Sequence, residues 1–306
     1  MLNSTIRATL IGFSAVVLWG SLALLTRLTD GAIPPFQLMA MTFFIAFLLM
    51  LSKWRYQGHW GTQFANQKPL VWLLGISGYF VYHLCYFLAM TKAPAVHISL
   101  IAYLWPLLIV LFSALLPGHF FRTKHVIGAL TALAGCWLLI GGGTEAFQAQ
   151  YLTGYVIAGA CAFIWSSFSV ASRLVSKVPT DAAGWFCGAT ALLALMCHLV
   201  WETSVWPANA RQWIGILGLG LGPVGIAFFT WDFGVKHGNI QLLGVLAYSA
   251  PLISVILLVL FGLGEASWSV AWACLAIVGG SLIAGVDRKM LKFPRRQTMK
   301  HHDDRL

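Results

Sequence analysis

The segment ISLIAYLWPLLIVLF, residues 98–112, is apolar enough to lie in a lipid bilayer, yet it has Tyr103, Trp105 and Pro106 near its centre. The segment LGVLAYSAPLISVIL, residues 243–257, repeats its Ala-Tyr-x-x-Pro-Leu pattern 145 positions later. A proline inside a helix leaves the carbonyl four residues upstream without its backbone partner. In a membrane such a carbonyl is tolerated only within protein or beside a water-filled cavity. The two segments therefore predict a pair of interrupted membrane helices at a buried or hydrated place.

The composition of the whole chain indicates a membrane protein. Of its 306 residues, 59% are hydrophobic and 9% are charged, whereas a soluble domain carries about 25% charged residues. Ten apolar stretches have roughly the 17–25 residues that a membrane-crossing helix needs. They cover residues 6–26, 35–52, 69–90, 95–116, 125–141, 151–176, 182–202, 210–235, 240–262 and 268–286. We therefore expect an all-α integral membrane protein with ten transmembrane helices.

The lysines and arginines predict how the chain is oriented, because short cytoplasmic loops carry an excess of these residues. With a cytoplasmic N-terminus, 16 of the 19 lie on the cytoplasmic side, and only Arg27, Lys92 and Arg211 lie opposite. Both termini are then cytoplasmic, as ten spans require. This bias also accounts for the net charge of +10, so the basic tail at residues 291–306 gives no reason to predict nucleic-acid binding.

An internal repeat relates the two halves of the chain. LWGSLALLTRL at residues 18–28 resembles IWSSFSVASRL at residues 164–174, and two further pairs of spans match at nearly the same offset. The chain is therefore predicted to contain two five-helix repeats, residues 1–145 and 146–290, followed by the basic tail. Because five is odd, the second repeat is inverted in the membrane. Transporters with inverted repeats bind their substrate near the midplane, between the repeats and beside interrupted helices.

Polar aromatic side chains gather at the predicted midplane. On the third span Tyr79, Tyr82, His83 and Tyr86 have the spacing of one helix face. Tyrosine usually lies at the membrane interface, so these side chains need internal partners or a wet cavity. A hydrogen-bonded packed core stays open as an alternative to a cavity wall. The candidate substrate-binding residues at this depth are Tyr79, Tyr82, His83, Tyr86, Tyr103, Trp105, Trp19, Trp165, Tyr248 and Ser249.

The charges that are missing from the middle of the spans narrow the substrate class. No Lys, Arg, Asp or Glu falls there, although a carrier of phosphates or dicarboxylates, or a proton-exchanging cation exporter, would be expected to have one. A neutral or zwitterionic substrate with an apolar or aromatic side chain fits best. His83 is the central group that titrates near neutral pH, and either a proton-carrying role or a place in the cavity wall stays open for it.

Helix-breaking residues supply candidate hinges, namely Pro106, Pro251, Gly222, Pro223 and Gly225.

The six cysteines all lie within spans without paired spacing, so neither a metal site nor a cofactor is predicted. The spans also lack paired carboxylates and a Ser/His/Asp set at compatible depths, which argues against an intramembrane enzyme.

The ten spans in a five-plus-five inverted repeat resemble the EamA branch of the drug/metabolite transporter (DMT) superfamily. AYLWP at 102–106, ATLIGFSAVVLWGS at 8–21 and HGN at 237–239 resemble bacterial aromatic amino acid exporters of the YddG type. The resemblance implies a ten-helix fold in the bacterial inner membrane and a cavity lined by Tyr103, Trp105 and Pro106. In the second half AYSAP stands where the first has AYLWP, so the halves are not equivalent.

The function expected from the residues and the resemblance is export of aromatic and other neutral amino acids by alternating access. The missing midplane carboxylate favours a facilitator. Two complete repeats in one chain predict a monomer that needs only its small-molecule substrate and the lipid bilayer. The alternative is a multidrug or nucleoside-type DMT exporter with proton coupling through His83.

Overall fold

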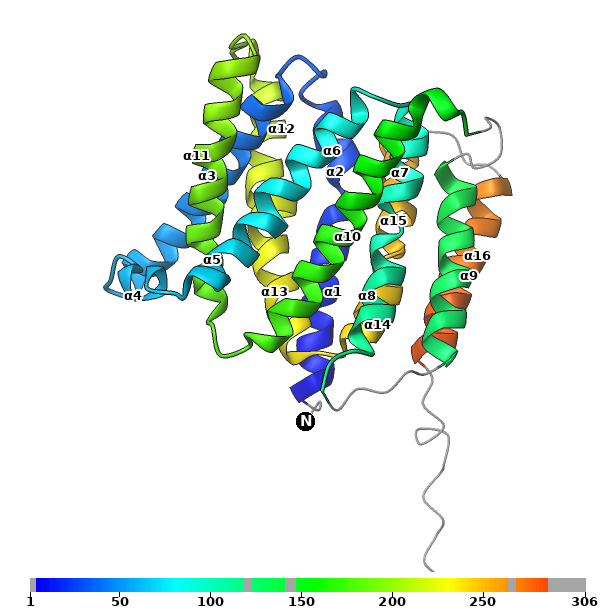
Figure 1. Ribbon diagram of the computed structural model, residues 1–306. Coiled ribbons are helices and arrows are strands. Elements are labelled where there is room, and N and C mark those ends of the chain that lie inside the picture. The colour runs from blue at the N-terminus through cyan, green and yellow to red at the C-terminus, as the bar shows by residue number, and fades with distance from the viewer. Residues whose placement is uncertain (1–3, 118–122, 141–146, 264–267, 286–306) are drawn as a thin grey trace, which may run out of the picture.

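The computed structural model describes residues 4–117, 123–140, 147–263 and 268–285. Within these ranges the chain is helical and has no strands, and the helices form a single bundle (Figure 1). The ten spans, in chain order, are α1 (Ser4–Gly20) with α2 (Leu22–Arg27); α3 (Pro35–Tyr56); α5 (Pro69–Ile76), η1 (Ser77–Val81) and α6 (Tyr82–Met90); α7 (Ala95–Ala102) with α8 (Trp105–Ser113); α9 (Thr123–Ile140); α10 (Leu152–Leu174); α11 (Ala183–Trp201); α12 (Ala210–Leu219), η4 (Gly220–Ile226) and α13 (Ala227–His237); α14 (Ile240–Leu246) with α15 (Ser249–Leu260); and α16 (Trp268–Gly285). The short helix α4 (Thr62–Ala65) and the 3-10 turns η2 (Ala149–Tyr151) and η3 (Thr180–Ala182) lie between spans.

These spans confirm the predicted transmembrane helices. Nine described spans are long and apolar enough to cross a membrane, and α16 is a shorter apolar helix. Proline sets several of the starts. Pro35 and Pro69 occupy the first position of α3 and α5, where a helix needs no backbone N–H, and Pro94 precedes α7.

The outer surface of the bundle is apolar, as a bilayer requires. On α11, for example, the side chains of Leu192, Leu199 and Val200 are all exposed. Large exposed apolar faces are rare on soluble monomers and are stable in contact with lipid. The protein is therefore a multi-pass membrane protein.

The two halves share the same irregularities at equivalent positions. The third span contains the π-helix η1 and the eighth contains the π-helix η4, and their starts, Ser77 and Gly220, are 143 positions apart. The fourth and ninth spans are each broken at their centres, at residues 103–104 and 247–248. Helix α1 and its counterpart α10 run in opposite directions (Figure 1). The fold is thus two inverted five-helix repeats.

Helices of one repeat pack on helices of the other. Helix α3 packs on α11, α1 on α13, and α9 on α16. Glycine permits the closest of these approaches, since a Cβ on Gly128 would lie 2.5 Å from the Gly280 carbonyl oxygen. Helix α1 begins and α16 ends at the same end of the bundle (Figure 1). The predicted boundary at residues 145–146 and the basic tail at 291–306 lie outside the described residues.

Candidate functional site: an aromatic cavity between the repeats

A cavity of about 1140 Å³ lies between the two repeats. Its walls come from the first four spans of the first repeat and from the sixth, eighth and ninth spans of the second. At one end it is lined by the exposed residues Asp30, Gly31 and Arg211. These residues follow α2 or begin α12, at the end of the bundle opposite the start of α1 (Figure 1). The cavity is therefore open at that end and reaches inward to the middle of the bundle.

Four aromatic rings form the inner wall. The ring centroid of Trp19 lies 6.1 Å from that of Trp105, 5.7 Å from Trp165 and 6.2 Å from Phe228, in edge-on geometry. Edge-to-face contacts of this kind are favoured between aromatic rings. These contacts hold together four spans, the first, fourth, sixth and eighth, and their rings offer faces and edges on which a flat apolar group can stack.

Hydrogen bonds fix the indole groups around this wall. The Nε1 of Trp19 donates to the carbonyl oxygen of Pro223 at 3.0 Å. Trp231, whose ring centroid lies 5.1 Å from that of Trp19, donates through Nε1 to the Ser169 hydroxyl at 3.1 Å. An indole N–H in a water-poor interior needs such an acceptor. The bond from Trp19 to Pro223 joins the two repeats, whereas the bond from Trp231 to Ser169 lies within the second repeat.

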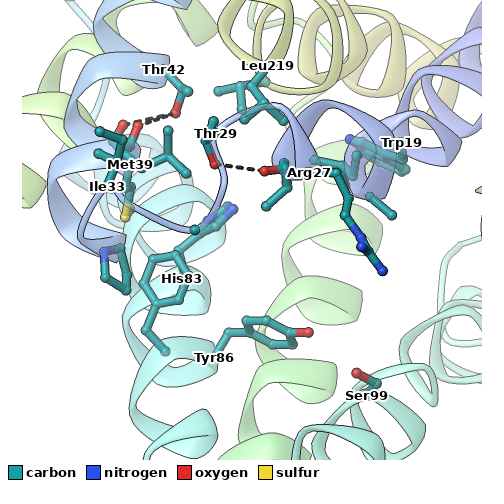
Figure 2. Close-up of a pocket in the computed structure, with 18 of the residues that line it drawn as sticks. Trp19, Arg27, Thr29, Ile33, Met39, Thr42, His83, Tyr86, Ser99 and Leu219 are labelled. Atoms are coloured by element: carbon teal, nitrogen blue, oxygen red, sulfur yellow. Dashed lines mark hydrogen bonds between the residues drawn. The ribbon is translucent and has the colours of Figure 1, made fainter. Parts of the chain in front are cut away.

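The third span contributes Tyr82, His83 and Tyr86 to the cavity wall, whereas Tyr79 is outside the lining. Figure 2 shows His83 and Tyr86 in this wall. Tyr79 is fully buried, with its ring stacked on Phe228 at 4.7 Å between centroids. The π-helix η1 accounts for the difference, because its i to i+5 bonding interrupts the α-helical spacing between Tyr79 and Tyr82. The Nδ1 of His83 is 2.6 Å from the Tyr79 carbonyl oxygen. A carbonyl only accepts, so Nδ1 carries the proton.

The two equivalent tyrosines of the broken spans have different surroundings. Tyr103 lines the cavity, whereas its counterpart Tyr248 is fully buried beside Val110 and Cys136. The Tyr248 hydroxyl accepts a hydrogen bond from the backbone N–H of Leu107 at 3.2 Å. It thus satisfies one of the free donors at the start of α8.

The structure brings seven of the ten candidate residues together around the cavity. These are Trp19, Tyr82, His83, Tyr86, Tyr103, Trp105 and Trp165. Tyr79, Tyr248 and Ser249 are outside its lining, although Ala250, next to Ser249, is part of it.

The candidate hinge residues lie at irregular points of the helices. Pro106 and Pro251 fall in the first turns of α8 and α15, just after the breaks. Gly222, Pro223 and Gly225 all lie within the π-helix η4.

Several lining residues gave no signal in the sequence. Phe228 packs against Trp19, Phe43 and Trp165, but a phenylalanine in an apolar span looks like any core residue. Thr42 on α3 also lines the cavity (Figure 2). Arg27, for which the sequence indicates only a place on one side of the membrane, extends into the open part of the cavity.

The end of the bundle near the start of α1 is closed. There the carboxylate of Asp232 accepts from Lys236 Nζ at 2.8 Å and from the Thr180 hydroxyl at 2.7 Å. Gly12 on α1 and Gly234 on α13 allow the two backbones to touch. Within the described ranges, no group of three or more His, Cys, Asp or Glu side chains is placed to hold a metal ion. The arrangement suits binding of a compact, partly aromatic solute that enters from the open end.

The family of the chain follows from a comparison with family models. The model described as the EamA-like transporter family matches twice, at residues 6–141 and 152–286. The chain belongs to the EamA-like transporter family. Its two matches coincide with the two helical repeats that enclose the cavity.

Individual relatives of this EamA chain are also similar over most of its length. It is 50% identical to the aromatic amino acid exporter YddG of Ancylobacter novellus, over 90% of this chain and 96% of that protein. It is 27% identical to the aromatic amino acid exporter YddG of Escherichia coli, with the same coverage. A solved crystal structure of a protein 48% identical in sequence superimposes with a TM-score of 0.89, covering 95% of this chain and 100% of the other.

Proposed function

We propose that this chain exports aromatic and other neutral amino acids through the cavity between its repeats. The observation that carries the proposal is the inner wall of Trp19, Trp105, Trp165 and Phe228, on which an aromatic side chain can stack. The 50% identity to a relative named as an aromatic amino acid exporter supports the same substrate class.

The proposed orientation places the chain in the bacterial inner membrane with both termini in the cytoplasm. The excess of Lys and Arg at one side supports it. In this orientation the cavity opens to the periplasm, and the end closed by Asp232, Lys236 and Thr180 faces the cytoplasm. The structure then corresponds to the state that releases an exported substrate.

Export would proceed by alternating access in a single chain, without a cofactor. The repeats would rock about the cavity, with Pro106, Pro251 and the η4 residues Gly222, Pro223 and Gly225 as hinges. Helix breaks and π-helical turns have fewer regular hydrogen bonds to disrupt. As a facilitator, the protein would move amino acids down their gradient and would catalyse no chemical reaction.

The test is flux of labelled tryptophan, phenylalanine and glutamate in proteoliposomes, with and without a pH gradient. We expect saturable tryptophan and phenylalanine flux that is indifferent to the gradient, and no glutamate flux. The double variant Y82A/W105A removes two aromatic side chains from the cavity wall and should lower phenylalanine flux at least tenfold. Unchanged flux in that variant would contradict the cavity assignment, and no aromatic flux in the native protein would overturn the substrate class.

A second candidate function is a multidrug or nucleoside-type exporter with proton coupling through His83. It is favoured by one observation, the placement of His83 in the cavity wall. Flux that requires the pH gradient, and that loses this requirement in H83Q, would support it. Competition of labelled phenylalanine by nucleosides would distinguish the two substrate classes.

A further inference from the structure

A charged side chain lines the cavity on the way to its aromatic wall. Arg27 is the last residue of α2, and it is exposed to the cavity that it lines. Figure 2 shows the side chain extending from the helix into the cavity, towards the part where Tyr86 and Ser99 lie. Arg27 follows Trp19 by two turns of helix, so the guanidinium and the aromatic wall belong to the same span.

The other charges in this wall leave Arg27 uncompensated. Asp30 and Arg211 also line the cavity, and the Asp30 carboxylate is 3.7 Å from Arg211 Nη1 and 3.4 Å from Gln212 Nε2. Asp30 is thus engaged by the start of α12. Among the described residues, Arg27 makes no ion pair or side-chain hydrogen bond. One negative charge faces two positive ones, so the open part of the cavity attracts anions.

We propose that Arg27 binds the carboxylate of the transported amino acid, an inference that rests on the proposed function. A guanidinium presents two parallel N–H donors that match the two oxygens of a carboxylate. The attraction is stronger in a cavity walled by apolar groups than in open water. An amino acid held in this way would place its carboxylate towards the open end and its aromatic side chain towards Trp19 and Trp165.

Arg27 would then determine specificity. Stacking on the aromatic wall alone accepts any flat apolar compound. The Arg27 guanidinium is paired only when the ligand has a carboxylate, so it favours amino acids over amines of the same size. An amine without a carboxylate leaves the guanidinium unpaired and places a second positive charge beside it. Arg27 would therefore separate amino acid export from general export of aromatic compounds.

The test compares two inhibitors of labelled tryptophan flux in proteoliposomes, phenylalanine and phenylalaninamide. The amide has the same ring but no carboxylate. For the native protein we expect phenylalanine to inhibit at a concentration at least tenfold lower than the amide. In R27Q the inhibitory concentration of phenylalanine should rise about tenfold or more, while that of the amide stays the same or falls. R27K, which keeps the charge, should lie between.

The matched control is K92Q, which removes a positive charge at the same end of the bundle but outside the cavity lining. It should leave both inhibitory concentrations unchanged. If R27Q changes phenylalanine and the amide by the same factor, or changes neither, Arg27 does not bind the carboxylate. That result leaves the proposed function intact, whereas absence of any aromatic amino acid flux in the native protein would defeat the function itself.

Discussion

The indole Nε1 of Trp19 donates a hydrogen bond of 3.0 Å to the carbonyl oxygen of Pro223, so a side chain of the first repeat is tied to the π-helical turn of the second. The same indole forms the inner end of the cavity. The wall on which a substrate would stack is therefore attached directly to the segment proposed to bend.

Replacing Trp19 by phenylalanine should keep an aromatic ring in the wall and remove the donor to Pro223. A buried carbonyl left without its donor costs about 1–3 kcal/mol. We expect W19F to lower the free energy of unfolding, measured by SDS titration in micelles, by about this amount. W137F changes an exposed indole on α9 and should shift it by less than about 0.5 kcal/mol. Equal stability of the two variants would rule out a role for the bond.

The contact between Gly12 and Gly234 makes a second prediction. A Cβ on Gly12 would lie 2.9 Å from the Gly234 Cα, so G12A must push α1 and α13 apart. We expect a loss of about 1–3 kcal/mol in stability and slower phenylalanine flux, because the proposed alternating access requires this end to close in every cycle. A Cβ on Gly159 of α10 meets nothing within 4 Å, so G159A should be neutral or stabilising. Similar losses in both variants would mean that the close approach is unimportant.

The buried pair of Asp232 and Lys236 should be costly to break. Their N–O distance is 2.8 Å and both side chains are nearly inaccessible. D232N leaves the Lys236 charge buried without its carboxylate, at a cost of about 3–5 kcal/mol. In the double variant D232N/K236M most of this loss should be recovered.

Lys53 and Asp181 form a comparison pair, in which the lysine side chain is 47% exposed. K53Q should cost less than about 1 kcal/mol. Both pairs are compared by the midpoint of thermal unfolding in detergent. A D232N midpoint no lower than that of K53Q would show that the buried pair does not hold this end together.

The two equivalent tyrosines, Tyr103 and Tyr248, should respond in different ways to loss of the hydroxyl. Y248F removes the acceptor for the Leu107 N–H and should cost about 1 kcal/mol of stability without changing the half-saturation concentration of phenylalanine flux. Y103F changes a cavity wall and should shift the half-saturation concentration with little effect on stability. The same kinetic change in both variants would contradict the different placements of these tyrosines.

Much of the fold could be predicted from the sequence because few kinds of backbone structure can cross a bilayer. The ten helices could be predicted from the lengths of the apolar spans and from prolines at helix starts, such as Pro35 and Pro69. The repeated Ala-Tyr-x-x-Pro-Leu indicated their division into two five-helix repeats. The site was harder to predict. Helical spacing placed Tyr79 with Tyr82, but the π-helical turn between them separates the two side chains. A local hydrogen-bond shift of this kind has no residue signature.

The repeated sequence pattern also did not predict that the two halves contribute different residues to the cavity. Tyr103 and Tyr248 share the Ala-Tyr-x-x-Pro-Leu pattern, and only the hydrogen bond from the Leu107 N–H shows that one of them caps a helix. Phe228 lies at the centre of the aromatic wall, yet an apolar residue in an apolar span does not stand out. For Arg27 the sequence predicts only a place on the side of the membrane opposite the N-terminus, because it does not reveal which way a side chain at a helix end extends.

The matching π-helices η1 and η4 bear on the ancestry of the protein. Each adds about one residue to a helical turn, and the two occur at equivalent places in halves whose local sequences, SGYFV and GLGPVGI, differ almost completely. One insertion before gene duplication explains both π-helices with fewer events than two independent insertions at the same point. The ancestral unit would then have been a five-helix protein that already contained the widened turn and had to pair with an inverted copy of itself to enclose a cavity.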